Sequence, residues 1–401
     1  MIQRNKCIEN IKAAYLFPEI AKRRREYAAA HPEAKIISLG VGNTTEAILP
    51  HIDQGLTEGA KRLGTAEGYS GYTDEGFEEL RKKISEVFYT GSFTVDEVFI
   101  SDGAKCDIGR LQLLFGAKTE VAVQDPSYPV YVDGSVLAGA AGGWSGTGYQ
   151  GITYLPCTAE NGYFPDLDGL PKNALFYFCS PNNPTGATAN REQLAALVKA
   201  AREKGVLIIF DAAYAEYIRD PVLPKSIFEI DGARTCAIEV NSFSKPAGFT
   251  GVRLGWTIVP RDLKYASGES VNADWARVCG TIFNGASNIA QWGALAALDA
   301  QGLKEMKELC DFYLGNAALI RGALRKLGID CAGGDNSPYI WARFPGRDSW
   351  DVFAEILEKC QVVTTPGAGF GPAGQGFIRF SAFGHRQDVE EACARLAKLK
   401  G

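Results

Sequence analysis

The chain has 401 residues, of which 46% are hydrophobic and 22% charged, and its formal net charge is −5. This length favours two or three domains with a large core, and the slightly acidic balance argues against a nucleic-acid-binding surface. The apolar runs have the length of strands and are far too short to cross a bilayer, so no membrane partner is expected either.

The ten cysteines are spread singly along the chain without a Cys-x-x-Cys pair, and only three histidines are present. We therefore expect free, buried thiols in a reducing compartment, no metal site, and no chemistry of the Ser-His type. The first residues contain no apolar segment of the secretory kind. We expect a cytoplasmic protein, or one of the plastid stroma if a transit peptide has been removed.

In chain order, the first forty-odd residues contain one expected helix, 19–30, and a short strand, which are too few to bury a core alone. Strand-like and helical patterns then alternate through the middle of the chain. The expected buried strands are 98–101, 120–124, 175–179, 206–211, 237–242 and 255–259, and the segment 190–204 has apolar residues at helical spacing. This alternation predicts an α/β fold with a mostly parallel, doubly wound sheet.

The pattern changes after about residue 286. A long helical stretch, 302–327, precedes a smaller α+β unit with strands near 339–343 and 377–381. We expect the N-terminal segment to join this unit. The predicted division is a large domain over 49–290 and a small domain formed from both termini, 1–48 and 291–401.

Polar residues follow the expected strands at the edge where open α/β sheets bind ligands. The segments are Asp102-Gly-Ala-Lys, Asp125-Pro-Ser-Tyr, Ser180-Pro-Asn-Asn-Pro-Thr-Gly, Asp211-Ala-Ala-Tyr and Asn241-Ser-Phe-Ser-Lys, with Arg253 eight residues further on. Each segment alone is an ordinary turn, helix cap or surface stretch. In this order they supply what a phosphorylated pyridine aldehyde requires, which predicts pyridoxal 5′-phosphate (PLP) as the cofactor.

The ring of this cofactor needs four kinds of group. Lys245 offers the amine that binds the aldehyde. Asp211 is the candidate carboxylate for holding a proton on the pyridine nitrogen, which lets the ring accept electrons. Asn183 and Tyr214 can donate hydrogen bonds to the phenolic oxygen, and Tyr128 can stack on the ring.

The phosphate of the cofactor needs hydroxyls, a guanidinium and free backbone amides. Ser242 and Ser244 supply the hydroxyls, and Arg253 supplies the guanidinium. The amides of Ala104 and Lys105 lie at the start of an expected helix, where backbone N–H groups bind anions.

Three of these motifs resemble the fold-type I PLP enzymes of the aspartate aminotransferase superfamily: Asn183-Pro-Thr-Gly, Asp211-x-x-Tyr, and Ser242-x-Ser-Lys followed by Arg253. The resemblance covers nearly the whole chain. It implies an aminotransferase with a seven-stranded sheet in its large domain, acting on amino acids and keto acids. It also implies a homodimer with active sites shared across the interface. Lys245, Asp211 and Tyr214 would be the catalytic residues, and Lys245 would also be the base that removes the α-proton.

Further segments resemble one branch of this superfamily, whose substrate carries an amino-acid group at each end. They are Tyr15-Leu-Phe-Pro-Glu-Ile, Leu39-Gly-Val-Gly, Ser101-Asp-Gly-Ala-Lys-Cys-Asp-Ile, Asp125-Pro-Ser-Tyr-Pro-Val-Tyr, Lys245-Pro-Ala-Gly-Phe-Thr-Gly and Phe283-Asn-Gly-Ala-Ser. Asn43 and Ala47 depart from the pattern of this branch, which commonly has Asp and Pro there.

The closer resemblance implies substrate contacts. Arg379 would grip the α-carboxylate bidentately, beside Tyr128 and Asn183. Tyr72 of the neighbouring subunit would reach the phosphate. The far end of the substrate would be lined by Tyr15, Gly42, Glu75, Lys105 and Asn284.

A distal amino-acid group carries both an ammonium and a carboxylate. Glu75 would face the ammonium, while Lys105 and Asn284 would lie near the carboxylate. An alternative for Glu75 is a solvated acid at a helix N-terminus, and both interpretations stay open.

Three other functions compete with this one. An aspartate or aromatic aminotransferase, or a PLP lyase, would share every cofactor residue. A non-catalytic binding relative would be free of cofactor, against which an intact Lys245 argues. A nicotinamide dehydrogenase would need a Gly-x-Gly-x-x-Gly turn, and Gly40-Val-Gly42 has no third glycine at that spacing.

Overall fold

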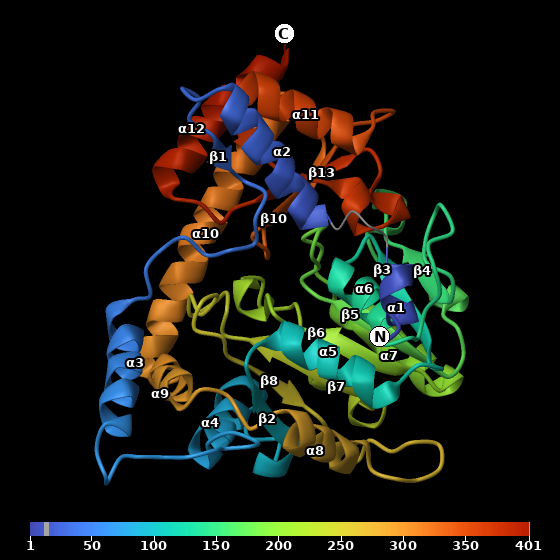
Figure 1. Ribbon diagram of the computed structural model, residues 1–401, viewed down its shortest axis with the longest axis vertical. Helices are drawn as coiled ribbons and strands as arrows, with labels where there is room; N and C mark the ends of the chain where they lie inside the picture. The colour runs from blue at the N-terminus through green and yellow to red at the C-terminus, as the bar shows by residue number, and fades with distance from the viewer. Residues whose placement is uncertain (12–15, 401) are drawn as a thin grey trace.

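The computed structural model describes residues 1–11 and 16–400, and its largest element is a seven-stranded sheet with the order β2-β8-β7-β6-β5-β3-β4 (Figure 1). The strands are β2 (Val98–Ser101), β3 (Glu120–Asp125), β4 (Ile152–Pro156), β5 (Ala174–Cys179), β6 (Leu207–Asp211), β7 (Ala237–Ser242) and β8 (Gly255–Ile258). The ladders from β4 through β3, β5 and β6 to β7 are parallel, and β8 is antiparallel to both β7 and β2. The predicted fold class is confirmed.

Helices cover both faces of this sheet. The apolar residues of α5 (Ala104–Phe115), α6 (Pro129–Leu137) and α8 (Val271–Ile282) belong to one buried cluster, and those of α7 (Arg191–Lys204) to another. On β5, Leu175 and Tyr177 join the first cluster, whereas Phe176 and Phe178 join the second. This alternation follows because successive side chains of a strand point to opposite faces, and it makes the sheet the centre of the core.

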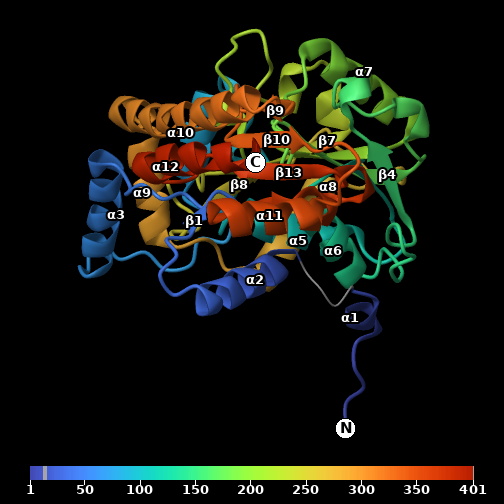
Figure 2. The same cartoon turned by 90° about the horizontal axis from the view of Figure 1, so that it is seen from above.

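A second unit is built around a four-stranded antiparallel sheet with the order β12-β13-β10-β9 (Figure 2). Its elements are β9 (Cys331–Gly333), β10 (Tyr339–Arg343), α11 (Ser349–Cys360), β11 (Val362–Val363), β12 (Thr365–Pro366), β13 (Phe377–Ser381) and α12 (Arg386–Leu396). From the N-terminal part, β1 (Ile37–Ser38) pairs with β11, and α2 (Leu16–Ala30) buries Leu16 and Ile20 in the same core. The N-terminal elements β1 and α2 therefore pack in the C-terminal unit.

The remaining helices connect and flank these two units. They are α1 (Lys6–Asn10), α3 (Pro50–Leu63), α4 (Glu78–Tyr89), α9 (Asn288–Ala297) and the long α10 (Ala300–Lys326). Helix α10 runs from α9 at the lower part of the molecule up to the small sheet (Figure 1). It begins at an N-cap, Asp299, whose side chain accepts from the amide of Gly302 at 2.9 Å. The domain limits at residues 48 and 290 stay predictions.

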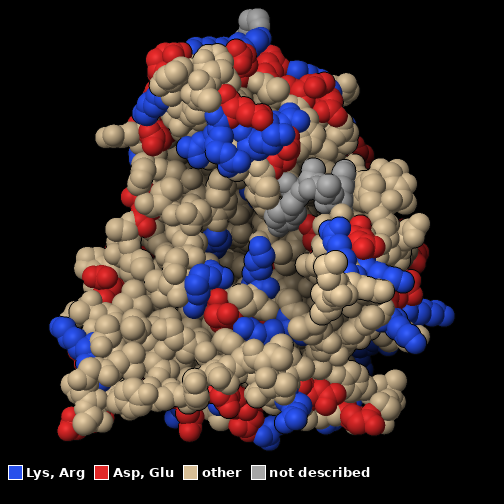
Figure 3. All heavy atoms as spheres, in the orientation of Figure 1, with Lys and Arg blue, Asp and Glu red and all other residues tan. Residues whose placement is uncertain are grey.

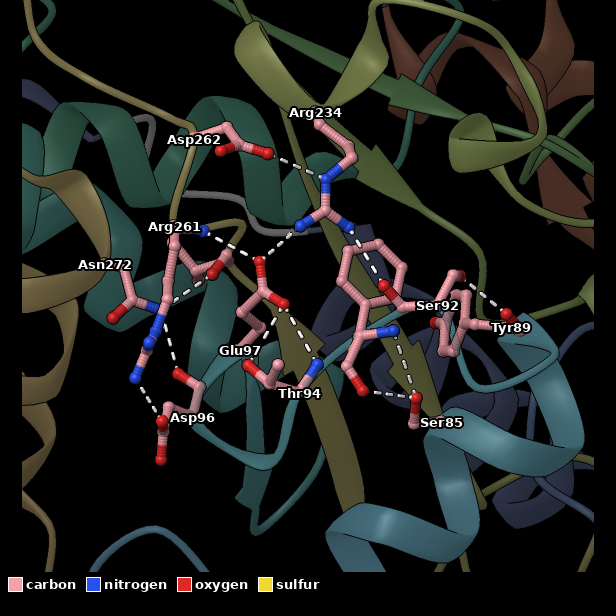
Figure 4. Close-up of polar contacts among 12 residues, drawn as sticks. Ser85, Tyr89, Ser92, Thr94, Asp96, Glu97, Arg234, Arg261, Asp262 and Asn272 are labelled. Atoms are coloured by element: carbon pink, nitrogen blue, oxygen red, sulfur yellow. Dashed lines mark hydrogen bonds and ion pairs between the residues drawn. The ribbon is translucent and has the colours of Figure 1, made fainter.

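A buried carboxylate fastens the antiparallel edge of the large sheet (Figure 4). Glu97, in the short helix η1 (Val95–Glu97) before β2, is 2% exposed. It accepts from the Arg234 guanidinium at 2.6 Å, from the Arg261 amide at 2.9 Å and from the Thr94 amide at 3.0 Å. One carboxylate thus ties three loops together, and its charge is balanced by a guanidinium.

Several expectations from composition can be compared with the fold. All ten cysteines are free, six buried and four half-buried. Over residues 1–11 and 16–400, no helix has the length and apolar character needed to cross a membrane. The same residues contain no group of three or more His, Cys, Asp or Glu side chains that could hold a metal ion.

Candidate active site

A cavity of about 340 Å³ opens at the carboxyl edge of the large sheet and extends under the small unit. The strand register brings several ends to this edge, because Cys179 of β5 lies opposite Asp211 of β6, and Asp211 lies opposite Val240 of β7. Figure 3 shows lysine and arginine side chains gathered around the hollow in the middle of this face. The sequence-predicted residues that line the cavity are Gly42, Ala104, Lys105, Tyr128, Asn183, Asp211, Tyr214, Ser242, Ser244, Lys245, Arg253 and Arg379.

Another cavity of similar size, about 360 Å³, lies between α2, α6 and the turn around residue 370. It contains none of the sequence-predicted residues. Volume alone does not separate the two cavities, so the converging polar groups of the first one decide where the candidate site is.

Asp211, at the end of β6, is 5% exposed and has a donor on each carboxylate oxygen. The amide of Ala213 donates to Oδ1 at 3.0 Å, and the hydroxyl of Tyr131 donates to Oδ2 at 2.7 Å. Burial raises the pKa of Asp211, and these two hydrogen bonds oppose the rise. Such a carboxylate would hold a proton shared with a pyridine nitrogen.

Lys245 follows β7, and its ammonium donates to the carbonyl of Gly42. Burial lowers the pKa of Lys245 to about 7, with the nearby charges of Arg379 and Arg253 acting in the same direction. A large share of this side chain is then the neutral amine near neutral pH, which is the form that attacks an aldehyde. Gly42 itself has no room for a side chain, since a Cβ there would lie 2.5 Å from the hydroxyl oxygen of Tyr339.

A cradle for an anion surrounds the start of α5. The first amides of this helix, at Ala104 and Lys105, have no acceptor within the helix. Arg253 donates to the hydroxyl of Ser244 at 3.1 Å, and its own φ is +71°. The preceding Gly103 has a φ of +118°, and a Cβ there would lie 2.4 Å from Nη2 of Arg253. The close approach of the guanidinium to a glycine at a helix N-terminus fits a phosphate.

Arg379, on β13, is a buried guanidinium with neutral partners. It is 1% exposed and donates to Oδ1 of Asn183 at 2.7 Å and to the carbonyl of Gly40 at 2.6 Å. Its Nε has no hydrogen-bond partner among the described residues, and its carbon Cζ lies 4.5 Å from the ring centre of Tyr339. Within residues 1–11 and 16–400, no carboxylate lies within ion-pair distance of it. A substrate carboxylate would complete this site.

Tyr214 lines the cavity, and its hydroxyl lies 2.8 Å from that of Tyr339. The Oδ1 atom of Asn183 is taken by Arg379, so its amide nitrogen is the group left to donate toward a ligand. These positions agree with a role for both side chains as donors to a ring oxygen.

The remaining predicted residues are Tyr15, Tyr72, Glu75 and Asn284. Tyr15 lies outside the described residues. Tyr72, Glu75 and Asn284 do not line the cavity of their own chain. Their segments lie against each other, because a Cβ on Gly285 would be 1.9 Å from the carbonyl oxygen of Thr73.

Glu75 has a fixed position within this surface. Its carboxylate forms an ion pair at 2.8 Å with Arg81, which is buried and also donates to the carbonyls of Val95 and Val98. The amide of Ile100 in β2 donates to the carbonyl of Glu75 at 2.9 Å. The ion pair with Arg81 holds the Glu75 carboxylate in place, while 40% of its side chain stays exposed to solvent.

Sequence reasoning missed two tyrosines that line the cavity, Tyr131 and Tyr339. Tyr131 belongs to the segment Asp125-Pro-Ser-Tyr-Pro-Val-Tyr that carried the closer resemblance, yet nothing in that segment indicates Asp211 as its partner. Tyr339 carries no sequence signal, because it appears as one aromatic residue in an expected strand.

Comparisons with known proteins agree with this geometry. The family described as aminotransferase class I and II matches residues 34–396. The chain is 52% identical to the chloroplastic LL-diaminopimelate aminotransferase of Arabidopsis thaliana, over 99% of this chain and 87% of that protein. It is 49% identical to LL-diaminopimelate aminotransferase of Protochlamydia amoebophila, over 99% and 97%.

Solved structures show the same similarity. The L,L-diaminopimelate aminotransferase from Chlamydomonas reinhardtii is 54% identical and superposes with a TM-score of 0.96, over 100% of this chain and 99% of that one. A mutant aspartate aminotransferase of Thermus thermophilus, at 21% identity and a TM-score of 0.85 over 100% of both chains, shares the fold.

Proposed function

The chain belongs to the class I and II aminotransferases, which use PLP, and we propose that it transfers an amino group between glutamate and tetrahydrodipicolinate to give LL-diaminopimelate and 2-oxoglutarate. This reaction would serve lysine biosynthesis. The observation that carries the proposal is the similarity, along the whole chain, to the Chlamydomonas enzyme of that name, at 54% identity and a TM-score of 0.96.

When bound, PLP supplies an aldehyde that captures an amino group and a ring that accepts the electrons released at the α-carbon. The residues of the cavity fit this group. Lys245 provides the amine and later takes the α-proton and returns it, for which its lowered pKa of about 7 suits it. Asp211 holds a proton at the ring nitrogen. Tyr214 and Asn183 donate to the ring oxygen, and Tyr128 packs on the ring.

The two ends of the reacting molecules would be held by separate groups. The phosphate would bind the amides of Ala104 and Lys105 together with Ser242, Ser244 and Arg253. The α-carboxylate of the amino acid would bind Arg379, whose Nε has no partner among the described residues. Because Arg379 is already fixed by its bonds to Asn183 and Gly40, little conformational entropy is lost on binding.

Discrimination between the two substrates would depend on the far end of the molecule. LL-diaminopimelate carries an ammonium there that glutamate lacks. Glu75, held in place by Arg81, would face this ammonium, while Lys105 and Asn284 would lie near the distal carboxylate, with Tyr15 and Gly42 beside them. Two of these residues, Glu75 and Asn284, do not line the cavity of their own chain.

That placement favours a homodimer in which these segments complete the site of the other subunit. Tyr72 is 84% exposed. Two residues close to these segments in the sequence are also exposed, Tyr69 at 68% and Ile282 at 53%. Exposed aromatic and aliphatic side chains of this kind are typical of protein interfaces. Figure 3 shows few charged side chains on the lower left face, where Figure 1 places α3 and α9. Tyr72 would then reach the phosphate of the partner's cofactor.

Mixed dimers test the sharing of sites. Alone, the Lys245→Ala variant is expected to be nearly inactive and the Tyr72→Phe variant to be impaired. Mixing them after mild dissociation should restore activity, because one of the two sites would then contain both intact residues. No gain on mixing, in samples shown to contain hybrids, would contradict the shared site.

For the compartment, we propose the cytoplasm or the plastid stroma, in keeping with ten free cysteines.

The substrate is tested on purified protein loaded with PLP. The absorbance of the bound cofactor is followed after separate addition of LL-diaminopimelate, meso-diaminopimelate, glutamate and aspartate. With 2-oxoglutarate supplied, glutamate formation is then assayed for the three donors other than glutamate. We expect fast conversion with the LL isomer and glutamate, and little with aspartate. Turnover with aspartate and none with LL-diaminopimelate would reassign the substrate. Release of ammonia with no glutamate formed from 2-oxoglutarate would indicate a lyase.

A further inference from the structure

We propose that Tyr131 is a positioning residue that orients the Asp211 carboxylate and keeps it ionised toward the pyridine nitrogen of the cofactor. The inference rests on the proposed role of Asp211 and extends it to a residue that does not itself touch the reacting atoms. Its basis is the hydrogen bond of 2.7 Å from the Tyr131 hydroxyl to Oδ2 of Asp211.

Asp211 depends on very few donors. It is buried, and in the described part of the chain no Lys, Arg or His forms an ion pair with it. The Ala213 amide serves Oδ1, and the Tyr131 hydroxyl serves Oδ2. A buried carboxylate without a cation is costly, so each donor to its charged form matters. Tyr131 is the one of these two that a substitution can remove.

Tyr131 is held in place through its backbone carbonyl and its ring. The backbone carbonyl of Tyr131 accepts from Ser135 Oγ at 2.6 Å and from Gln112 Nε2 at 3.2 Å. Its ring stacks on that of Tyr177, with 5.2 Å between ring centres and 8° between the planes. Gly134 leaves space for Gln112, because a Cβ there would lie 2.0 Å from Oε1 of that glutamine. The side chain therefore has little freedom to turn away from Asp211.

This anchoring also joins the two ends of the cofactor site. Gln112 lies in α5, whose first amides form the phosphate cradle, and Tyr131 lies in α6, which Gln112 fixes to α5. The same pair of helices thus faces the phosphate at one end and supports Asp211 at the other. We infer that the distance between these two ends is set by α5 and α6 packing, with Tyr131 as the contact to the carboxylate.

The test compares Tyr131→Phe with Tyr177→Phe. The control removes a buried hydroxyl from the same ring stack, and Tyr177 neither lines the cavity nor donates to Asp211. Two quantities are measured: the dissociation constant of PLP from the apo-protein, and the ¹⁵N chemical shift of the pyridine nitrogen in bound, labelled PLP. Steady-state kinetics give kcat and KM separately.

We expect Tyr131→Phe to weaken PLP binding by about tenfold, the effect of one hydrogen bond to a charged group. Its nitrogen shift should move toward that of neutral pyridine, and kcat should fall with KM little changed. Tyr177→Phe should keep the wild-type nitrogen shift. Equal effects of the two variants, or a wild-type nitrogen shift in Tyr131→Phe, would overturn the proposal.

A second variant tests the proposal if Tyr131→Phe fails to fold. Replacing Tyr131 with 3-fluorotyrosine makes the phenol a stronger donor with little change in volume, so the nitrogen shift should move toward protonated pyridine. An unchanged shift would overturn the proposal. Failure of the proposed function is distinguishable, because the wild-type protein would then bind no PLP or leave its pyridine nitrogen neutral.

Discussion

Glu239 offers a test of how burial controls stability beneath the active site. This residue lies on β7, the strand that leads to Ser242 and Lys245, and it is 1% exposed. Its carboxylate accepts from the hydroxyls of Tyr89 and Ser226, both at 2.6 Å. Unlike Glu97, which is paired with Arg234 (Figure 4), Glu239 forms no ion pair within the described residues. We expect Glu239→Gln to remove a pH-dependent loss of stability.

The magnitude follows from the pKa of this group. Burial raises the pKa of Glu239 from its ordinary 4.5 to about 7, against the opposing hydrogen bonds. The folded state then binds the proton more tightly than the unfolded chain. Stability from this group is fully present below the unfolded pKa and is lost as the pH rises through the folded one. At about 1.4 kcal/mol per tenfold change, the whole loss is roughly 3 kcal/mol.

The part of this stability loss that occurs between about pH 6 and about pH 9 is roughly 1.4 kcal/mol, because the Glu239 carboxyl of the folded protein is still mostly protonated at the lower pH. Urea unfolding of the PLP-saturated protein at these two values measures it. Other titrating groups are common to both proteins, so the difference between wild type and Glu239→Gln isolates this carboxyl. Glu97→Gln is the control, since it removes a buried carboxylate that has a guanidinium partner and should destabilise the protein. Parallel pH profiles for wild type and Glu239→Gln would refute the reasoning.

Three further predictions concern binding. Arg379→Lys should lower kcat/KM for amino acids about a hundredfold, because a point charge replaces a bidentate guanidinium and leaves Asn183 without its donor. A decrease of kcat/KM under threefold in steady-state assays would contradict this prediction. Gly103→Ala should weaken PLP binding at least about tenfold, since the added Cβ would lie 2.4 Å from Nη2 of Arg253 and the φ of this residue is +118°. Equilibrium dialysis measures the dissociation constant of PLP, and a wild-type value would refute the phosphate site at the start of α5. Glu75→Gln should lower kcat/KM for LL-diaminopimelate about tenfold and that for glutamate less than about twofold; equal losses would exclude a distal role.

The cofactor end of the site could be predicted from sequence because it depends on local order. Asp211, Ser242 and Lys245 each follow an apolar run of strand length, and the ends of parallel strands meet at one edge whatever the details of packing. The structure extends some of these strands by a residue and shortens others, as with β6, which begins at Leu207. One strand of the large sheet was not recognised: β4, Ile152–Pro156, follows a glycine-rich stretch and is only partly buried.

The contacts that adjust the site could not be predicted, because they join residues distant in sequence. The bond from Lys245 to Gly42 spans 203 residues, and that from Tyr131 to Asp211 spans 80. A tyrosine in a helix and a glycine carbonyl in a loop give no local sign of such partners. The environment of Glu239 could not be predicted either, since a single acidic residue in an apolar strand does not show whether a cation lies near it.

The outer residues show a further limit of a single chain. Tyr72 and Glu75 lie on one segment, and Asn284 lies on another, with the carbonyl of Thr73 packed directly against Gly285. We propose that two segments packed together in this way serve the same cavity. If Tyr72 reaches the phosphate of a partner subunit, Glu75 and Asn284 face the substrate of that same partner. Cofactor affinity and discrimination at the distal ammonium would then depend on one interface, and a change that separates the subunits should impair both together.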